Sequence, residues 1–337
     1  MNHSATHRTT PARFLARAFT LYELLTVLAI VGILLAILLP TLASARRAAQ
    51  TAATQTFMRD IAIACNQFQL DNNGTNPGRF TPAEMASTEN DARGFSTMQN
   101  ILLDLVGGEA KDLTDTAAIQ NVGPLSDVTR RLIVNPNLIG SNRPGGKAYL
   151  ILGSAQLATQ NAPGRVATGV LPAHTQIPDV IDYFKTPIIA WVADDRAPTS
   201  PNAHRQFATL TSQNEIARYY WSSNRTYLGQ GGPQTASMLY QLRNDDPRRY
   251  TMTGVLGNPS FPELPNIAGP RVPSQSRGQI VFHSAGRNGI FVGSEERGGK
   301  IAAAAAGSLA AAQVQFTPSV DPMSNGDFDD VIVSSGN

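Results

Sequence analysis

The sequence is poor in cysteine and in charged residues, and each shortage narrows what the protein can be. Cys65 is the only cysteine among 337 residues, so the chain cannot form an intramolecular disulfide. Asp, Glu, Lys and Arg together make up 15% of the residues, and the formal net charge is +2. Such a small net charge gives no strong attraction to nucleic acid. With 28 glycines and 22 prolines, the composition favours a loop-rich fold that contains β-strands over a helical bundle.

Histidine is scarce as well, and the sequence signals for an enzyme are weak. The five histidines include no His-Glu-x-x-His motif and no clustered metal-ligand spacing. His283 and Ser284 are neighbours in sequence, and adjacency alone does not make a catalytic triad. Gly293–Lys300 departs from a P-loop because its first glycine is one position early and Ile301 stands where Ser or Thr is required. We therefore expect a protein that is not an enzyme.

What the sequence does have is a long apolar run close to its N-terminus. Phe19–Leu39 contains a single charged residue, Glu23, and Pro40 closes the run. As a helix, these 21 residues would span about 30 Å, the thickness of a bilayer core. Three arginines and no acid precede the run, and basic flanks favour the cytoplasmic side of a membrane. Arg46 and Arg47 follow the run and weaken this bias.

Glu23 distinguishes among three interpretations of the run. A carboxylate in a membrane-spanning helix costs roughly 2.5–3.5 kcal/mol, which argues for a specific role. A secretory signal peptide cleaved after Ala45 would place this acid in its apolar core and Arg46 just after the cut, and both features argue against it. A plain membrane anchor leaves the acid unexplained. In the third interpretation the helix packs against copies of itself, where a buried charge is tolerated because it is paired.

The start of the run supports the third interpretation. Ala18–Leu25, AFTLYELL, resembles the prepilin processing site of type IV pilins and type II secretion pseudopilins. The resemblance implies that a prepilin peptidase cleaves between Ala18 and Phe19 and methylates the new amino group of Phe19. It also implies that Glu23 and Pro40 serve filament assembly, since they match the family's acid and its helix-bending proline. Ala18 departs from the family pattern, which usually has glycine before the cut.

The same resemblance implies an α+β fold, with a long N-terminal membrane-spanning helix followed by a head with a small antiparallel sheet. Residues 1–18 are then a leader peptide. The helix covers residues 19–75 and is transmembrane over 19–39 and extracytoplasmic over 40–75. Residues 76–337 form the extracytoplasmic head. The protein is expected as a single-pass protein of the bacterial inner membrane, with a cytoplasmic N-terminus and a periplasmic head, and later in a filament.

Residue patterns predict the secondary structure after Pro40. The helix continues to about Leu70, and Asp71–Gly74 ends it with turn residues. We expect one apolar stripe of this helix to pack against the head: Phe57, Ile61, Ala64 and Phe68. An insertion at about 78–180 contains a helical pattern at Thr97–Val106. Strands are predicted at Ala148–Leu152, Ile188–Val192, Gln279–His283 and Ile290–Val292, and a short helix at Ile301–Gln313.

Two C-terminal segments carry a further resemblance. Ser284–Phe291 and Asp327–Val331 are similar to segments of major pseudopilins, in which a loop in this region binds calcium. The resemblance implies a calcium site with these candidate ligands: Asn288, Asp327, Asp329 and Asp330. Calcium takes about six to eight oxygen ligands, and carboxylates are typical among them. The alternative is a turn followed by a solvated acidic tail. No cofactor is otherwise required.

We therefore expect a pseudopilin-like or pilin-like subunit that assembles into a filament, with type II protein secretion as its first expected role. Its expected partners are other pseudopilin or pilin subunits, the prepilin peptidase, the inner-membrane assembly platform and membrane lipid, and they include no nucleic acid. A membrane-anchored extracytoplasmic binding protein that never polymerises is the alternative. A secreted enzyme released after Ala45 is the third class.

Overall fold

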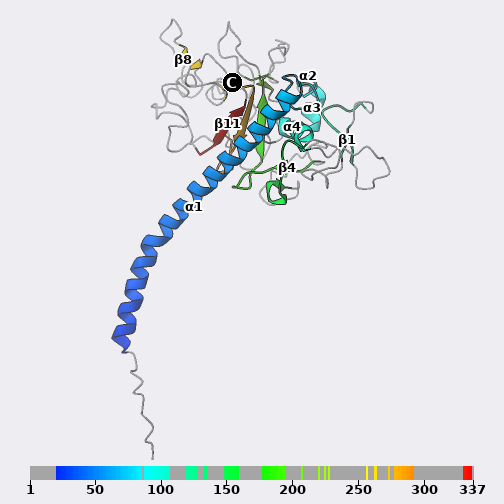
Figure 1. Ribbon diagram of the computed structural model, residues 1–337. Helices are drawn as coiled ribbons and strands as arrows, with labels where there is room; N and C mark the ends of the chain where they lie inside the picture. The colour runs from blue at the N-terminus through cyan, green and yellow to red at the C-terminus, as the bar shows by residue number, and fades with distance from the viewer. Residues whose placement is uncertain are drawn as a thin grey trace, which may run out of the picture. The chain divides into compact units, whose positions relative to one another are not determined.

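The computed structural model describes residues 20–85, 87–106, 119–127, 132–134, 148–158, 177–193, 206–207, 219–220, 224, 227, 256, 262–263, 272–273, 277–291 and 329–335 (Figure 1). The predicted cleavage site at Ala18 and Phe19, the candidate ligand Asp327 and the predicted helix at 301–313 lie outside these residues. The chain divides into two compact units, Met1–Ala49 and Gln50–Asn337.

The longest element is helix α1, Leu21–Asp71, which begins in the first unit and ends in the second. Its end follows from the local sequence. Asn73 and Gly74 adopt positive φ values of 55° and 76°, and such residues commonly end a helix. The amide of Gly74 donates a hydrogen bond to the carbonyl of Gln69 at 2.8 Å, which satisfies one of the last carbonyls of the helix. The predicted turn after Leu70 is confirmed.

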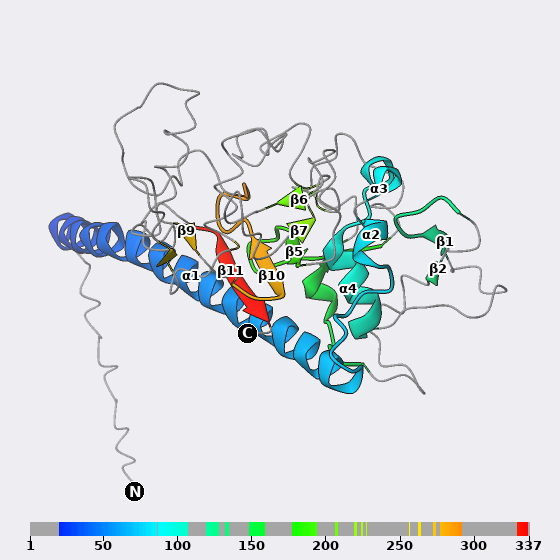
Figure 2. The ribbon, with the colours of Figure 1, turned by 90° about the horizontal axis from the view of Figure 1, so that it is seen from above.

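In the second unit, the second half of α1 packs against a three-stranded antiparallel sheet and a further helix (Figure 2). The strand order is β11–β10–β5, and the strands are Val331–Ser335, Ile280–Ser284 and Ile188–Val192. The helix is α4, Thr97–Val106, whose apolar residues enter the same core. The shared core includes Met58 and Ile61 of α1, Ile101 and Leu102 of α4, and Ala190, Phe282 and Val331 of the sheet.

The apolar stripe of α1 is confirmed as the face that packs on the head. Phe57, Ile61 and Ala64 are buried, and Phe68 is partly buried against the same core. Cys65 is fully buried beside them, and burial raises the pKa of its thiol well above the usual range. Cys65 is therefore an apolar packing residue.

Shorter elements complete the described part of the second unit. The other helices are α2 (Pro82–Met85), α3 (Thr88–Arg93) and the 3-10 helix η3 (Ser154–Gln156). Two-stranded antiparallel ladders join β1 (Ile119–Val122) to β2 (Leu132–Val134), β3 (Leu157–Ala158) to β4 (Asp179–Val180), β6 (Gln206–Phe207) to β7 (Tyr219–Tyr220), and β8 (Pro262–Glu263) to β9 (Val272–Pro273). A long apolar N-terminal helix followed by small antiparallel sheets confirms the predicted α+β, pilin-like fold.

The predicted strand at Ala148–Leu152 is wrong. These residues form no strand, because their backbone hydrogen bonds go elsewhere. The amides of Tyr149 and Leu150 both donate to the carbonyl of Leu105 at the end of α4, at 2.9 and 3.2 Å. The segment therefore caps a helix instead of joining a sheet.

The predicted strand at Ile290–Val292 is also wrong where the structure describes it. Gly289 has a φ of 70°, and the side-chain oxygen of Asn288 accepts a hydrogen bond from the amide of Ile290 at 2.6 Å. This local turn takes the Ile290 amide away from a strand ladder. Strand β10 pairs with β5 and β11 instead, in register from Ile280 to Ser284.

Candidate functional site

The N-terminal end of α1 is held by reciprocal hydrogen bonds between Thr20 and Glu23. The amide and the hydroxyl of Thr20 donate to Glu23 Oε2 at 2.8 and 2.9 Å. The amide of Glu23 donates in return to Thr20 Oγ1 at 3.2 Å. This arrangement is a capping box, which satisfies orphan amides at the start of a helix. The carboxylate that the sequence analysis singled out is therefore bonded within its own chain.

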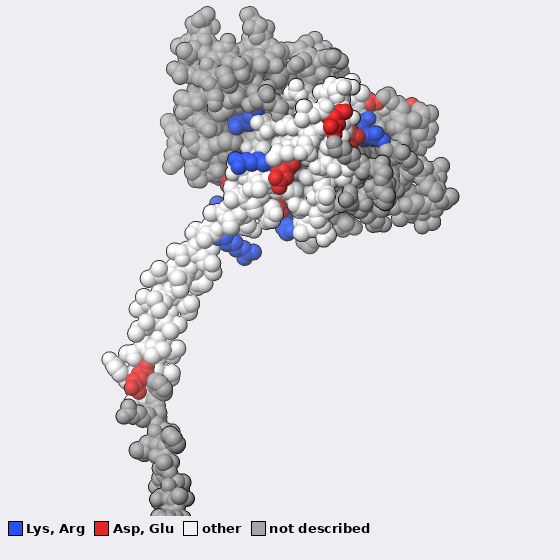
Figure 3. Space-filling view, viewed as in Figure 1, with Lys and Arg blue, Asp and Glu red and all other residues white. Residues whose placement is uncertain are grey.

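The first unit presents an apolar surface along α1. From Leu24 to Ala45 the helix carries no Asp, Glu, Lys or Arg, and Figure 3 shows this stretch free of colour between one acidic group and the basic groups that follow. In the part of α1 that belongs to the first unit, the exposed fraction of the large apolar side chains ranges from 44% at Val31 to 82% at Leu21. By length and composition, α1 is able to cross a membrane. One such N-terminal helix agrees with a single-pass membrane anchor.

Pro40, the second predicted assembly residue, lies inside α1 without ending it. Proline has no amide proton, so Pro40 cannot donate to the carbonyl one turn earlier. The next two hydroxyls are satisfied within the helix, since Thr41 donates to Leu38 at 2.8 Å and Ser44 donates to Thr41 at 2.9 Å. Internal satisfaction of polar groups suits a helix surrounded by lipid or by other apolar helices.

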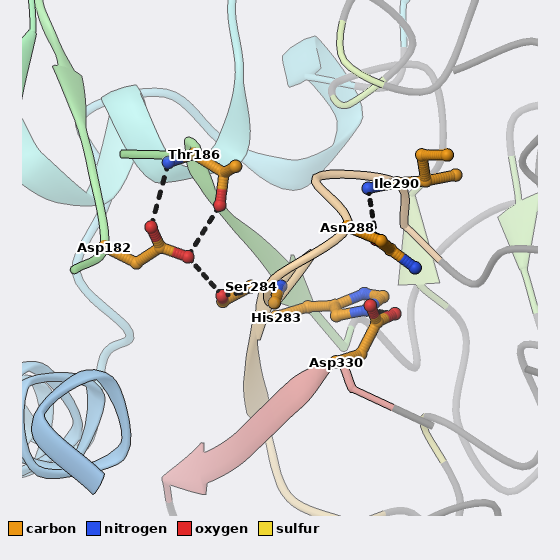
Figure 4. Close-up of polar contacts among 8 residues, drawn as sticks. Asp182, Thr186, His283, Ser284, Asn288, Ile290 and Asp330 are labelled. Carbon is orange, nitrogen blue, oxygen red and sulfur yellow. Dashed lines mark hydrogen bonds and ion pairs between the residues drawn. The ribbon is translucent and has the colours of Figure 1, made fainter. Parts of the chain in front are cut away.

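In the second unit, the carboxylate of Asp182 organises the loop that leads into β5 (Figure 4). Its Oδ1 accepts from the amides of Phe184 and Thr186 at 2.8 and 2.9 Å. Its Oδ2 accepts from the hydroxyls of Thr186 and Ser284 at 2.6 and 2.5 Å. Burial raises the pKa of the Asp182 carboxyl, and these hydrogen bonds oppose that rise. One buried carboxylate thus joins the loop to β10.

The same loop contacts α1. The amide of Tyr183 donates to the hydroxyl of Thr54 at 3.3 Å, and the side chain of Gln50 donates to the carbonyl of Tyr183 at 3.2 Å. The rings of Phe57 and Tyr183 pack edge to face, with their centroids 6.4 Å apart. The Asp182 loop therefore connects the second half of α1 with the three-stranded sheet.

His283 and Ser284 do not form a catalytic triad, because neighbouring residues of a strand point to opposite faces (Figure 4). Ser284 donates to Asp182, whereas His283 Nε2 lies 2.6 Å from Asp330 Oδ2. The side chains of His283 and Asp330 are both fully buried, and the His283 ring packs edge-on against Phe291. Burial lowers the pKa of His283 to about 3. The pair is part of the packing between β10 and β11.

Two of the predicted calcium ligands, Asn288 and Asp329, are brought together by the structure. Asp329 Oδ2 accepts from the amide of Asn288 at 2.9 Å and lies 3.9 Å from the Nε of Arg287. The side-chain oxygen of Asn288, the atom expected to bind calcium, already accepts from the amide of Ile290 at 2.6 Å. Both side chains therefore make hydrogen bonds within the protein.

Asp330, the third described ligand candidate, directs its carboxylate to His283 and away from this pair. In the part of the chain that the structure describes, no group of three or more His, Cys, Asp and Glu side chains could hold a metal ion. The described donors, as arranged, do not fit a calcium ion, which needs about six to eight oxygens around one point. Asp327 lies outside the described residues.

Comparison with known proteins gives one informative match. A stretch of 58 residues is 41% identical to the type IV wide pilus major component PilA4 of Thermus thermophilus. The match covers 17% of this chain and 44% of that relative, so the chain spans less than half of the relative's length. The chain is type IV pilin-like. No family model and no solved structure matches this pilin-like chain.

Sequence reasoning found part of the site of this pilin-like protein. It singled out Glu23 and Pro40, and their roles in assembly stay predictions. It missed the bonding of Glu23 to Thr20, although the spacing Thr-x-x-Glu is the signature of a capping box. It also missed the hydrogen bonds of Asp182 to β10, for which no local signal exists, because Ser284 lies 102 residues away.

Proposed function

We propose that this protein is a filament subunit, anchored in the bacterial inner membrane by the first half of α1 and assembled with other pilin-like subunits through the same segment. The observation that carries the proposal is the exposed apolar surface from Leu24 to Ala45, which contains no charged residue and directly follows Glu23. Lipid covers such a surface before assembly, and neighbouring helices cover it afterwards. In this role the head is structural, and the protein is not an enzyme.

The kind of filament follows from two different likenesses. The Thermus relative is named as a component of a type IV pilus, which supports a pilus-type filament. The pseudopilin-like segments Ser284–Phe291 and Asp327–Val331 support the second candidate, type II protein secretion. Deleting the gene separates the two, because a pilus subunit is needed for surface filaments and a pseudopilin is needed for release of secreted proteins.

Processing is the first step of the proposal. A prepilin peptidase removes residues 1–18 on the cytoplasmic side and methylates Phe19, and the assembly platform then extracts the subunit from the membrane. Residues 19–75 supply the helix and the turn that ends it, and residues 76–337, including the insertion at about 78–180, supply the periplasmic head. Support comes from the likeness of Ala18–Leu25 to a prepilin site and from α1 beginning at Leu21.

Glu23 connects processing to assembly. In the separate subunit its carboxylate is held by the amide and hydroxyl of Thr20. After cleavage, the ammonium of Phe19 on a neighbouring subunit neutralises it, which removes the cost of roughly 2.5–3.5 kcal/mol for a charge in an apolar helix. Glu23 thus has two separable roles, one as a helix cap and one as a charge.

The experiment compares Glu23→Gln with Thr20→Ala in the native host. Gln replaces Glu in a capping box, so Glu23→Gln keeps the cap and removes the charge. Thr20→Ala keeps the charge and weakens the cap, at a cost of about 0.5–2 kcal/mol. We expect the unmodified chain and Thr20→Ala in isolated filaments. We expect Glu23→Gln in the membrane fraction, with its amount in filaments reduced at least tenfold.

The outcomes separate the proposals. If the unmodified chain stays in the membrane and never enters filaments, the membrane-anchored binding protein is the correct function. If Glu23→Gln enters filaments in the same amount as the unmodified chain, the filament role stands and the charge pairing is wrong. Glu23→Val, which loses both the cap and the charge, should insert in the membrane and assemble no better than Glu23→Gln.

A further inference from the structure

We infer that, in the described part of the chain, groups of the protein itself close the junction between β10 and β11, in the place where the pseudopilin-like sequence implied a calcium ion. The closing group, called here the C-terminal clasp, consists of His283, Gly286, Arg287, Asp329 and Asp330. It joins the turn after β10 to the two residues that precede β11. This inference is independent of filament assembly.

The inner part of the clasp is the pair of His283 and Asp330. Their side chains are fully buried, and His283 Nε2 lies 2.6 Å from Asp330 Oδ2. A buried carboxylate requires a partner, and the imidazole is that partner here. The Oδ2 atom of Asp330 is thus engaged by His283 and is directed to the buried side of the junction. Asp330 therefore closes the junction from within the protein.

The outer part of the clasp is the pair of Arg287 and Asp329. The guanidinium Nε of Arg287 lies 3.9 Å from Asp329 Oδ2, and the amide of Asn288 donates to the same oxygen at 2.9 Å. A guanidinium beside the carboxylate supplies the positive charge that a calcium ion would otherwise supply. The same guanidinium repels a divalent cation from this position.

Among the described residues, the backbone of the turn at Gly286 lies directly against the backbone of Asp329. A Cβ on Gly286 would run into the carbonyl of Asp329, so the turn and the strand approach each other directly. Asp329 and Asp330 are consecutive, yet Asp329 contacts Asn288 and Arg287, whereas Asp330 contacts His283. Figure 4 shows Asp330 beneath His283, on the far side from the hydroxyl of Ser284. As placed, the two carboxylates therefore do not converge on one point.

The first test is thermal unfolding of the full-length chain in detergent micelles, with millimolar calcium chloride or with the chelator EGTA. Calcium that binds the folded state alone would raise the midpoint, and the rise would grow with calcium concentration. The clasp predicts the same midpoint in both solutions. A midpoint that is several degrees higher in calcium, with a saturating dependence on its concentration, would overturn the inference.

The second test is a double-mutant cycle on the inner pair, measured in both solutions. His283→Leu and Asp330→Leu each leave one buried polar partner unpaired, so each should lower the midpoint by several degrees. The double variant replaces the pair with apolar side chains and should recover most of the loss. Asp60→Asn, an exposed acid of α1, is the matched control and should leave the midpoint unchanged.

A calcium site predicts different results from the same variants. Asp330→Leu would then abolish the rise of the unfolding midpoint in calcium. Adding His283→Leu would not recover the lost stability. Arg287→Ala would increase the effect of calcium, because a repelling charge is gone. Under the clasp, Arg287→Ala lowers the midpoint slightly and equally in calcium and in EGTA. The comparison of the unmodified chain in the two solutions remains decisive even for a variant that fails to fold.

Discussion

The backbone conformation at position 286 of the C-terminal clasp favours glycine over any residue with a Cβ atom. Its φ of 59° lies in the left-handed region, and a Cβ there would run into the carbonyl of Asp329. We expect Gly286→Ala to lower the free energy of unfolding by about 1–3 kcal/mol or more, because strain and collision add. Gly153→Ala is the control, since its φ is −79° and the nearest atom to a new Cβ is 3.7 Å away. Denaturant titration measures both variants, and equal stabilities would contradict this account of Gly286.

His283 makes stability depend on pH. Burial lowers its pKa to about 3, whereas the unfolded chain takes up this proton near 6.5. Between these values the unfolded state binds one more proton, so stability falls as the pH is lowered, by up to about 1.4 kcal/mol per unit. His283→Gln removes this dependence. Its stability deficit relative to the unmodified chain should therefore shrink between about pH 7 and about pH 5, as measured by denaturant titration at each pH. A deficit that stays constant would show that His283 does not titrate in the transition.

The second half of helix α1 has one face buried against the head and another exposed, and two isoleucines test this difference. Ile61 is fully buried against the head, whereas Ile63, on the same helix, is 52% exposed. We expect Ile61→Ala to destabilise the chain by about 2–5 kcal/mol, through lost packing and the cavity left behind. Ile63→Ala should cost less than about 1 kcal/mol, because its side chain is half exposed. Urea unfolding of the two variants compares them directly, and similar losses would mean that the predicted stripe is not the docking face.

Elements with a regular apolar pattern could be predicted from the sequence, and those defined by distant partners could not. The stripe of α1 and the helix Thr97–Val106 follow from spacings of three and four residues. Ile188–Val192 reads as a strand and is one. Ala148–Leu152 has the same kind of apolar content, yet its amides bond to the end of α4. Local sequence does not say which acceptor lies nearby in the folded chain.

The same limit applies to the polar residues of the site. Glu23 stands out because an acid is rare in an apolar run, and its partner Thr20 is three residues away. Asp182 makes three of its four hydrogen bonds within four residues, but the fourth joins it to Ser284, 102 residues away on β10, and local sequence does not indicate that bond. Asp329 and Asp330 are adjacent in sequence, yet Asp329 accepts a hydrogen bond from the amide of Asn288 and Asp330 lies against His283. A resemblance suggested one shared ion for residues whose carboxylates contact different partners in the structure.

In the molecule as a whole, the two units differ in where their apolar side chains lie. The first unit exposes its apolar side chains, whereas the second has a core of its own to which the segment after residue 78 contributes α4. No disulfide supports that core, because Cys65 is the only cysteine. The head is therefore held by packing and by polar groups such as Asp182 and the His283–Asp330 pair. This division suits a subunit in which other molecules bury the first half of α1, while the second half of α1 belongs to the core of the second unit.

The intact mass of the chain isolated from its native host, from membranes and from filaments, tests the central claim most directly. A pilin-like subunit that has been processed begins at Phe19 and carries one additional methyl group on its amino terminus. We expect that mass in the filament fraction, with the longer precursor confined to the membrane. Replacing Ala18 with a bulky residue should shift the population to the precursor. A mature chain that begins at Arg46, or an uncut chain in both fractions, would contradict the account.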